Sequence, residues 1–89
     1  MFHILVVEDD AKLRSLFCTV LTNSGYLALP AESSEKALSL LDSEYVDLII
    51  SDIMMPGMSG TELCAKIKNN IETCHIPVVL LTALSAPER

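Results

Sequence analysis

The chain has 89 residues and a mass of 9.7 kDa, which is enough for one domain and too little for two. Apolar types make up 51% of the residues, which argues against intrinsic disorder, because a disordered chain lacks the apolar side chains that offset its ordering entropy. The formal net charge of −6 disfavours direct binding to nucleic-acid backbones or to anionic membrane surfaces. Since the chain has no Trp and only 4% aromatic residues, aliphatic side chains must form the core.

The cysteine pattern and the N-terminus favour the cytoplasm. Cys18, Cys64 and Cys74 are odd in number and lack C-x-x-C spacing, which fits neither a disulfide framework nor a zinc site and suits a reducing compartment. Residues 1–4 contain neither a basic segment nor a cleavable apolar stretch. The longest apolar run, 77–84, is far too short to span a bilayer. We therefore expect a cytoplasmic protein with no membrane segment.

The first third of the chain predicts a strand, a helix and a second strand. Residues 4–7 are an unbroken branched run, typical of a strand that is covered on both faces. Apolar residues then recur at helical spacing over 13–21, where Asp10 can cap the first turn and Gly25 can end the last. Residues 26–29 predict a second, weaker strand that ends at the proline after them.

The rest of the chain continues the alternation with a helix, a strand, a helix and a strand. Their apolar segments are, in that order, 37–41, 46–50, 63–67 and 77–81. Ser33 or Ser34 can cap the first of these helices, and the Ser-Gly-Thr-Glu at 59–62 has the pattern of a capping box for the second, whose pattern allows an extension to Ile71. This order predicts a parallel sheet with helices on both faces, because each right-handed crossover must pack back onto the sheet.

Acidic and hydroxyl side chains gather where the predicted strands end. In such sheets the functional crevice lies beyond the carboxyl ends of the strands. Glu8 and Asp9 follow the first strand, Asp52 follows the third, and Thr82 follows the fourth. A 2-1-3-4 strand order would place the first and third strands side by side. The three carboxylates would then converge.

Three close carboxylates repel one another unless a cation neutralises them. Mg²⁺ does this well, because it prefers oxygen ligands and keeps waters that a phosphoryl oxygen can replace. The cluster therefore predicts a Mg²⁺ site at which phosphoryl chemistry can occur. Asp52 is the best candidate nucleophile, since it ends the most buried-looking strand and an aspartate can form an aspartyl-phosphate. Thr82 could donate a hydrogen bond to a phosphoryl oxygen.

Each of these residues also has a simpler interpretation when it is taken alone. Acidic residues just after a strand are common turn formers and helix caps, so a structural role is the default for Glu8 or Asp9. Asp52 could form an Asx turn, and Thr82 could simply end its strand. Both histidines lack a partner at ligand spacing, and the methionines after Asp52 could plug the loop. Only the joint placement of the carboxylates favours function.

Three sequence blocks together resemble the CheY-like receiver domain of two-component response regulators. They are ILVVEDD at 4–10, SDIMMPGMSG at 51–60 and PVVLLTA at 77–83, in the order and at the spacing of that family. The likeness covers essentially the whole chain and implies one receiver domain over residues 1–89. It also implies the family's fold class, α/β with a flavodoxin-like, doubly wound parallel sheet of order 2-1-3-4.

By this resemblance, Asp52 accepts a phosphoryl group from a histidine kinase in a Mg²⁺-dependent phosphorelay. Asp9 would bind the Mg²⁺ directly, Glu8 through water, and Met54 through its backbone carbonyl. We therefore expect a signalling switch that acts on a downstream effector or on an attached kinase or output domain, and no enzyme. The sequence does not resemble a DNA-binding effector.

The resemblance also implies supporting roles around the site. Thr82 matches the switch hydroxyl that meets the phosphoryl group, and Ala83 matches the small residue that leaves room beside it. Pro56 and Gly60 match the loop that shapes the rim of the site. The run at 75–83 is, in addition, similar to receivers in hybrid sensor kinases.

The sequence departs from the family pattern in two ways. Glu8 stands where Asp is commoner, although its longer side chain still reaches a metal-bound water. The chain also ends at Arg89, before the family's last strand and last two helices. In the family, this missing part includes a Lys that pairs with the phosphoryl group. Lys66 and Lys68 do not match that position, because they lie on the third predicted helix. We expect this fragment to label weakly, and to self-associate, swap strands or be poorly stable, because its fourth strand becomes an edge. The alternative is a portion of a longer protein.

Two other functions compete with a phosphorylated switch. One is a receiver-like interaction module that binds partners without being phosphorylated. The other is a phosphatase with an aspartate nucleophile, which would need a second acid two residues after Asp52. Met54 stands at that position, so the phosphatase hypothesis is set aside.

Overall fold

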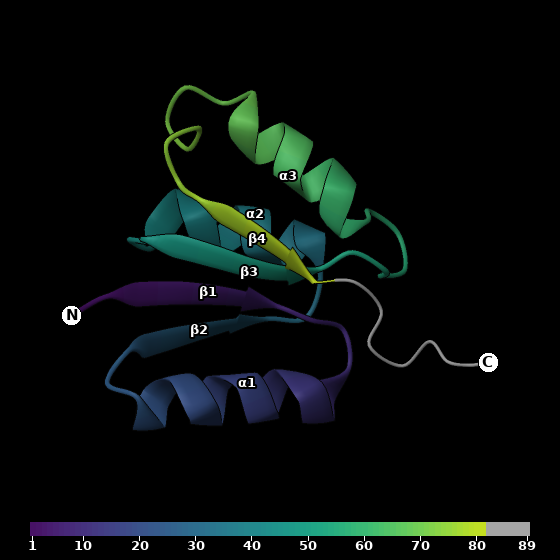
Figure 1. The fold of residues 1–89 in the computed structure, drawn as a ribbon. Helices are drawn as coiled ribbons and strands as arrows, with labels where there is room; N and C mark the ends of the chain where they lie inside the picture. The colour runs from purple at the N-terminus through teal and green to yellow at the C-terminus, as the bar shows by residue number, and fades with distance from the viewer. Residues whose placement is uncertain (82–89) are drawn as a thin grey trace.

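The computed structural model describes residues 1–81, which form four strands and three helices in strict alternation. The strands are β1 (His3–Val7), β2 (Leu27–Ala31), β3 (Leu48–Asp52) and β4 (Val78–Leu81), and the helices are α1 (Ala11–Asn23), α2 (Ser34–Ser43) and α3 (Gly60–Lys68). All neighbouring strands are parallel, in the order β2-β1-β3-β4. Helix α1 covers one face of the sheet, and α2 and α3 cover the other (Figure 1). The predicted fold class and strand order are confirmed.

Helix capping follows the sequence pattern closely. Asp10 caps α1, because its side chain accepts hydrogen bonds from two backbone N–H groups of the first turn. Of the two serine candidates for α2, Ser33 is the cap. The capping box that opens α3 is confirmed in both directions, with Ser59 and Glu62 each accepting from the other's backbone N–H.

Three element boundaries differ from the prediction. Strand β3 runs from Leu48 to Asp52 instead of over 46–50, so Asp52 is its last residue. Strand β2 begins at Leu27 and continues through Pro30 to Ala31, which an edge strand tolerates because the missing N–H of proline need not pair there. Helix α3 ends at Lys68, so its predicted extension to Ile71 is wrong. Ile71 is 88% exposed in a turn after the helix. An isolated apolar residue at helical spacing does not continue a helix when nothing packs on it.

The core is aliphatic, as the composition predicts. Strand β1 is buried on both faces from Ile4 to Val7, and the buried hydrophobic residues include no aromatic side chain among residues 1–81. Helix α1 contributes no fully buried residue, and Leu16 and Val20 on it are each 54% exposed. The face of the sheet toward α2 and α3 is therefore better covered than the face toward α1.

The two histidines have structural or solvent-exposed places, as the sequence suggests. The backbone N–H of His3 donates to the Asp47 carboxylate at 2.7 Å, which lowers the pKa of Asp47 and ties the start of β1 to the residue before β3. The His3 ring Nδ1 lies 2.9 Å from the Tyr45 carbonyl oxygen. His75 is exposed.

Among the described residues, no helix combines the length and the apolar character that crossing a membrane requires.

Candidate metal and phosphoryl site

The topology brings three acidic side chains together at one edge of the sheet. Strand β1 pairs with β3 in a register that sets Val7 opposite Ser51, so the next residues, Glu8 and Asp52, lie at the same level. One carboxylate oxygen from each of Glu8, Asp9 and Asp52 lies within 4.8 Å of the others. The predicted convergence of the acidic residues is confirmed.

Glu8 is the buried member of this cluster. Its side chain is only 4% exposed, whereas Asp52 is half-buried and Asp9 is exposed. Burial raises the pKa of Glu8, and the charges of Asp52 and Asp9 raise it further, although a hydrogen bond from the Asp10 N–H opposes this shift. Burial and the neighbouring carboxylates therefore disfavour the charged form of Glu8. Hard oxygen donors at this spacing fit Mg²⁺, whose positive charge would favour that form.

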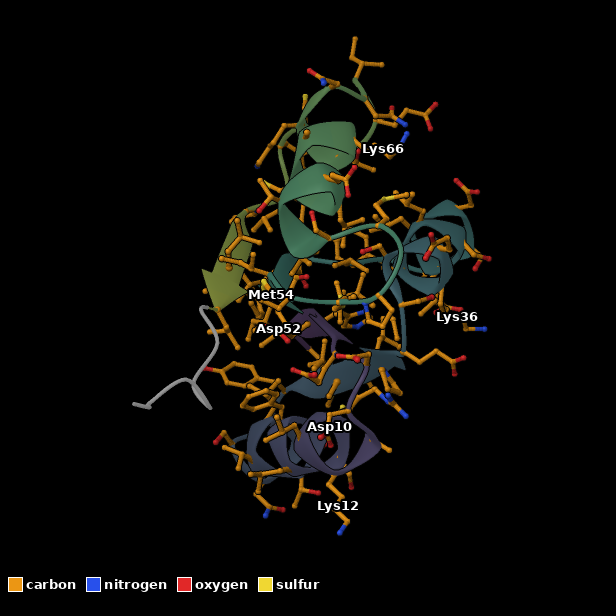
Figure 2. The ribbon with its side chains drawn as sticks, turned by 90° about the vertical axis from the view of Figure 1, so that its right-hand side faces the viewer. Asp10, Lys12, Lys36, Asp52, Met54 and Lys66 are labelled. Atoms are coloured by element: carbon orange, nitrogen blue, oxygen red, sulfur yellow. The ribbon has the colours of Figure 1, made fainter. Side chains whose placement is uncertain are left out.

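The methionines after Asp52 fall into two groups. Met54 is 67% exposed and lies next to Asp52 (Figure 2). An exposed side chain at this position agrees with a role for the backbone carbonyl alone, and that role stays a prediction. Met55 and Met58 are partly buried against the core, which agrees with the interpretation of these residues as loop plugs.

The loop from Asp52 to α3 is held in close backbone contact at Gly60. The Gly60 N–H donates to the Ile53 carbonyl at 2.9 Å. A Cβ atom at Gly60 would lie 2.1 Å from the Asp52 carbonyl oxygen, so no larger residue fits without moving the backbone. Gly57 in the same loop has a φ of 75°, which favours glycine. Pro56 also lies in this loop. Its predicted role in shaping the rim stays a prediction.

Lysine side chains on the three helices stand away from the acidic cluster. Lys66 and Lys68 lie in the last turn of α3, as predicted, and Lys68 donates to the carbonyls of Cys74 and Ile76. Figure 2 shows Lys12, Lys36 and Lys66 apart from Asp52, on the outer sides of their helices. Two predicted site residues, Thr82 and Ala83, lie outside the described residues.

Sequence reasoning missed two polar residues that hold the loops of the site. Arg14 donates to the backbone carbonyl of Glu8, and Ser34, which is buried, donates to the carbonyl of Met58 at 2.9 Å. The sequence could have indicated the contact of Arg14, because this residue lies one helical turn after the Asp10 cap of α1 and so close to the preceding loop. No such indication existed for Ser34, since its partner is 24 residues away.

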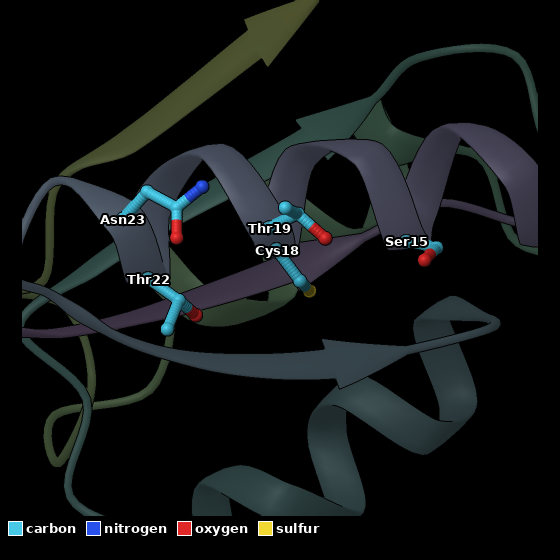
Figure 3. Close-up of a pocket in the computed structure, with 5 residues that line it drawn as sticks. All are labelled: Ser15, Cys18, Thr19, Thr22 and Asn23. Atoms are coloured by element: carbon cyan, nitrogen blue, oxygen red, sulfur yellow. The ribbon is translucent and has the colours of Figure 1, made fainter.

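Two hollows within the described residues share no residue with the acidic cluster. One, of about 250 Å³, runs along α1 and is lined by Ser15, Cys18, Thr19, Thr22 and Asn23 (Figure 3). Burial raises the pKa of the Cys18 thiol, which disfavours its thiolate form. A second, apolar groove of about 350 Å³ is lined by Leu16, Phe17, Val20, Leu21, Ile50 and Leu81.

The fold and the site together define a class of protein. It is an α/β domain with three carboxylates at the carboxyl ends of neighbouring parallel strands. The sequence model of the response regulator receiver domain matches residues 4–89. The chain therefore belongs to the response regulator receiver domain family.

Curated relatives include a histidine kinase and transcriptional regulatory proteins. The chain is 52% identical over 83 residues to Histidine kinase P4 of Formosa agariphila, and the match covers 93% of this chain and 6% of that protein. It is 41% identical over 86 residues to the phosphate regulon transcriptional regulatory protein PhoB of Escherichia coli, with 97% and 38% covered. The chain thus spans well under half the length of these relatives.

Solved structures share the fold at moderate identity. The N-terminal domain of a response regulator receiver protein from Methanoculleus marisnigri has a TM-score of 0.90 and 38% identity, with 98% of this chain and 71% of that chain covered. The response regulator TrrA of Thermotoga maritima, solved in complex with Mg²⁺-BeF, has a TM-score of 0.86 and 40% identity, with 96% and 72% covered.

Proposed function

We propose that this chain is a phosphoryl-accepting signalling domain in which Asp52 takes a phosphoryl group from a histidine kinase in a Mg²⁺-dependent reaction. The observation that carries the proposal is the convergence of the Glu8, Asp9 and Asp52 carboxylates at adjacent strand ends. Membership of the receiver family supports it, as does the Mg²⁺-BeF in the similar TrrA structure.

In the proposed transfer, a carboxylate oxygen of Asp52 forms a bond to phosphorus while the P–N bond of the donor phosphohistidine breaks. The electron pair of that bond leaves on the imidazole nitrogen, and the product is an aspartyl-phosphate. Bound Mg²⁺ would neutralise the carboxylates and the phosphoryl oxygens. Asp9 and Asp52 would hold it directly, Glu8 through water, and Met54 through its carbonyl.

Four further residues complete the proposed site on the strength of the family resemblance. Thr82 would provide the switch hydroxyl, and Ala83 would leave space beside the phosphoryl group. Pro56 and Gly60 would shape the rim, and the close backbone contact at Gly60 supports that role.

The proposed partners follow from the relatives. A histidine kinase would be the donor, and the output would pass to a downstream effector or to an attached kinase or output domain, since both kinds of protein carry similar sequences. The domain would act as a switch and not as an enzyme, without direct contact to nucleic acid or membrane. The proposed setting is the cytoplasm, which keeps the three free thiols reduced.

A Mg²⁺ titration followed by NMR separates this function from an unphosphorylated interaction module. The backbone amides around Asp52 are expected to shift as Mg²⁺ binds. Asp9→Asn is expected to weaken binding about ten-fold or more, since even groups that only support a metal ligand contribute that much. Asp42→Asn, the same change at an exposed position on α2, is the control and should bind as the wild type does. Silent spectra in the wild type would favour the interaction module.

We further propose that the 89-residue polypeptide pairs with a second copy of itself. Within residues 1–81, β4 pairs with β3 alone, and the apolar groove beside α1 ends at Leu81 on that edge strand. An open strand edge next to an apolar surface recruits another chain. Leu16 lines this groove and is 54% exposed.

Sedimentation velocity over a concentration series tests this pairing. The wild-type polypeptide is expected to form a dimer or larger species as its concentration rises, and Leu16→Lys should shift it toward the monomer because the groove then carries a charge. Ile71→Lys makes the same change outside the groove and should leave the association unchanged. A cooperative monomer at high concentration would refute the proposal.

A further inference from the structure

We propose that Arg14 is a positioning residue for the metal site, which it serves by fixing the backbone of the loop that carries Glu8 and Asp9. This inference rests on the proposed function, because it assigns Arg14 a part in Mg²⁺ binding. Arg14 itself does not touch the metal in this assignment. It acts through the two acidic residues.

The contacts of Arg14 converge on that loop. Its Nη1 donates to the carbonyl oxygen of Glu8 at 2.8 Å and lies 3.4 Å from the carbonyl oxygen of Asp9. Its backbone N–H donates to the carbonyl oxygen of Asp10 at 2.9 Å, as the first bond of α1. One residue on the helix therefore contacts the carbonyls of three consecutive acidic residues.

Within residues 1–81, Arg14 is the protein donor to two of these carbonyls, those of Glu8 and Asp9. The N–H of Glu8 donates to Ala31 on β2 at 3.0 Å, and the N–H of Asp10 donates to the Glu8 carboxylate. Among residues 1–81, no backbone N–H donates to the carbonyl of either Glu8 or Asp9. Because backbone polar groups need partners, the guanidinium decides how these two peptide groups are oriented.

Arg14 is also well placed to stay in this position. Its side chain is half-buried and lines a hollow between α1 and β2, together with Ala11, Ser15, Cys18 and Pro30. The aliphatic stem can pack along this surface while the planar head reaches the carbonyls. A flexible surface cation would not hold the loop in the same way.

A purely electrostatic role predicts the opposite effect on Mg²⁺. The positive charge of Arg14 lies close to the acidic cluster and repels Mg²⁺, so removing that charge should tighten Mg²⁺ binding. A positioning role predicts that removal weakens binding, because the carboxylates lose their fixed arrangement. The sign of the change in affinity therefore separates the two roles.

The test measures the Mg²⁺ dissociation constant of folded protein by NMR titration. Arg14→Gln removes the charge and the guanidinium, whereas Arg14→Lys keeps the charge and loses the planar donor. Loss of a hydrogen bond to a charged donor is expected to weaken Mg²⁺ binding about ten-fold in Arg14→Gln and about three-fold in Arg14→Lys. Amide hydrogen exchange at Asp9 and Asp10 in metal-free protein should accelerate in both variants.

Lys12→Gln is the matched control, because Lys12 lies on the first turn of the same helix and points away from Asp52 (Figure 2). It removes the same charge without a contact to the loop, and is expected to leave Mg²⁺ binding unchanged or slightly tighter. Wild-type affinity in Arg14→Lys together with tighter binding in Arg14→Gln would overturn the positioning role while leaving the proposed function intact. Absence of Mg²⁺ binding in the wild type would overturn both.

Discussion

Replacing Asp52 with asparagine is expected to abolish phosphoryl labelling by acetyl phosphate in the presence of Mg²⁺. The amide keeps the size of the side chain but loses the negative oxygen that would attack phosphorus. Transfer from acetyl phosphate breaks its P–O bond and releases acetate, so no kinase is needed. Mass spectrometry of intact protein, followed by peptide mapping, gives the fraction labelled and the residue that carries the label.

The control for this experiment makes the same aspartate-to-asparagine substitution at a position outside the site. Asp42→Asn, on the exposed side of α2, should label as the wild type does. Equal labelling of Asp52→Asn and the wild type would refute Asp52 as the acceptor.

The positions of the strands and of the acidic cluster were predictable from the sequence because both depend on local patterns. An unbroken branched run such as Ile4 to Val7 has few alternatives to a buried strand. A parallel sheet then places polar residues after each strand at the same edge, so Glu8, Asp9 and Asp52 converge once the strand order is known. The strand order itself came from the family resemblance.

Features that depend on tertiary contacts were not predictable in the same way. Apolar spacing suggested an extension of α3 to Ile71, although that side chain is exposed, because spacing alone does not reveal whether a partner surface exists. The bonds of Arg14 and Ser34 to backbone carbonyls were also missed. A carbonyl acceptor is present at every residue, so a sequence pattern does not single out the one that receives the bond.

Gly60→Ala is expected to destabilise the fold and to disturb the metal site together. The added Cβ would lie 2.1 Å from the carbonyl oxygen of Asp52, 2.9 Å from its carbonyl carbon and 3.0 Å from the Cα of Ile53. All three are backbone atoms, so the clash is relieved only if the end of β3 or the start of α3 moves. Overpacking of this kind costs about 3 kcal/mol, a large part of the about 5–15 kcal/mol by which a domain is stable.

Gly25→Ala separates this clash from the general cost of replacing a glycine. Gly25 has a φ of 94° and open space around the position of a Cβ atom, so its replacement costs only about 1 kcal/mol of backbone strain. Urea unfolding should therefore give a clearly lower free energy of unfolding for Gly60→Ala than for Gly25→Ala. Because the contact at Gly60 is with Asp52 itself, Mg²⁺ affinity should fall in Gly60→Ala and stay unchanged in Gly25→Ala. Equal stability of the two variants would contradict the close backbone contact on which the proposed rim of the site depends.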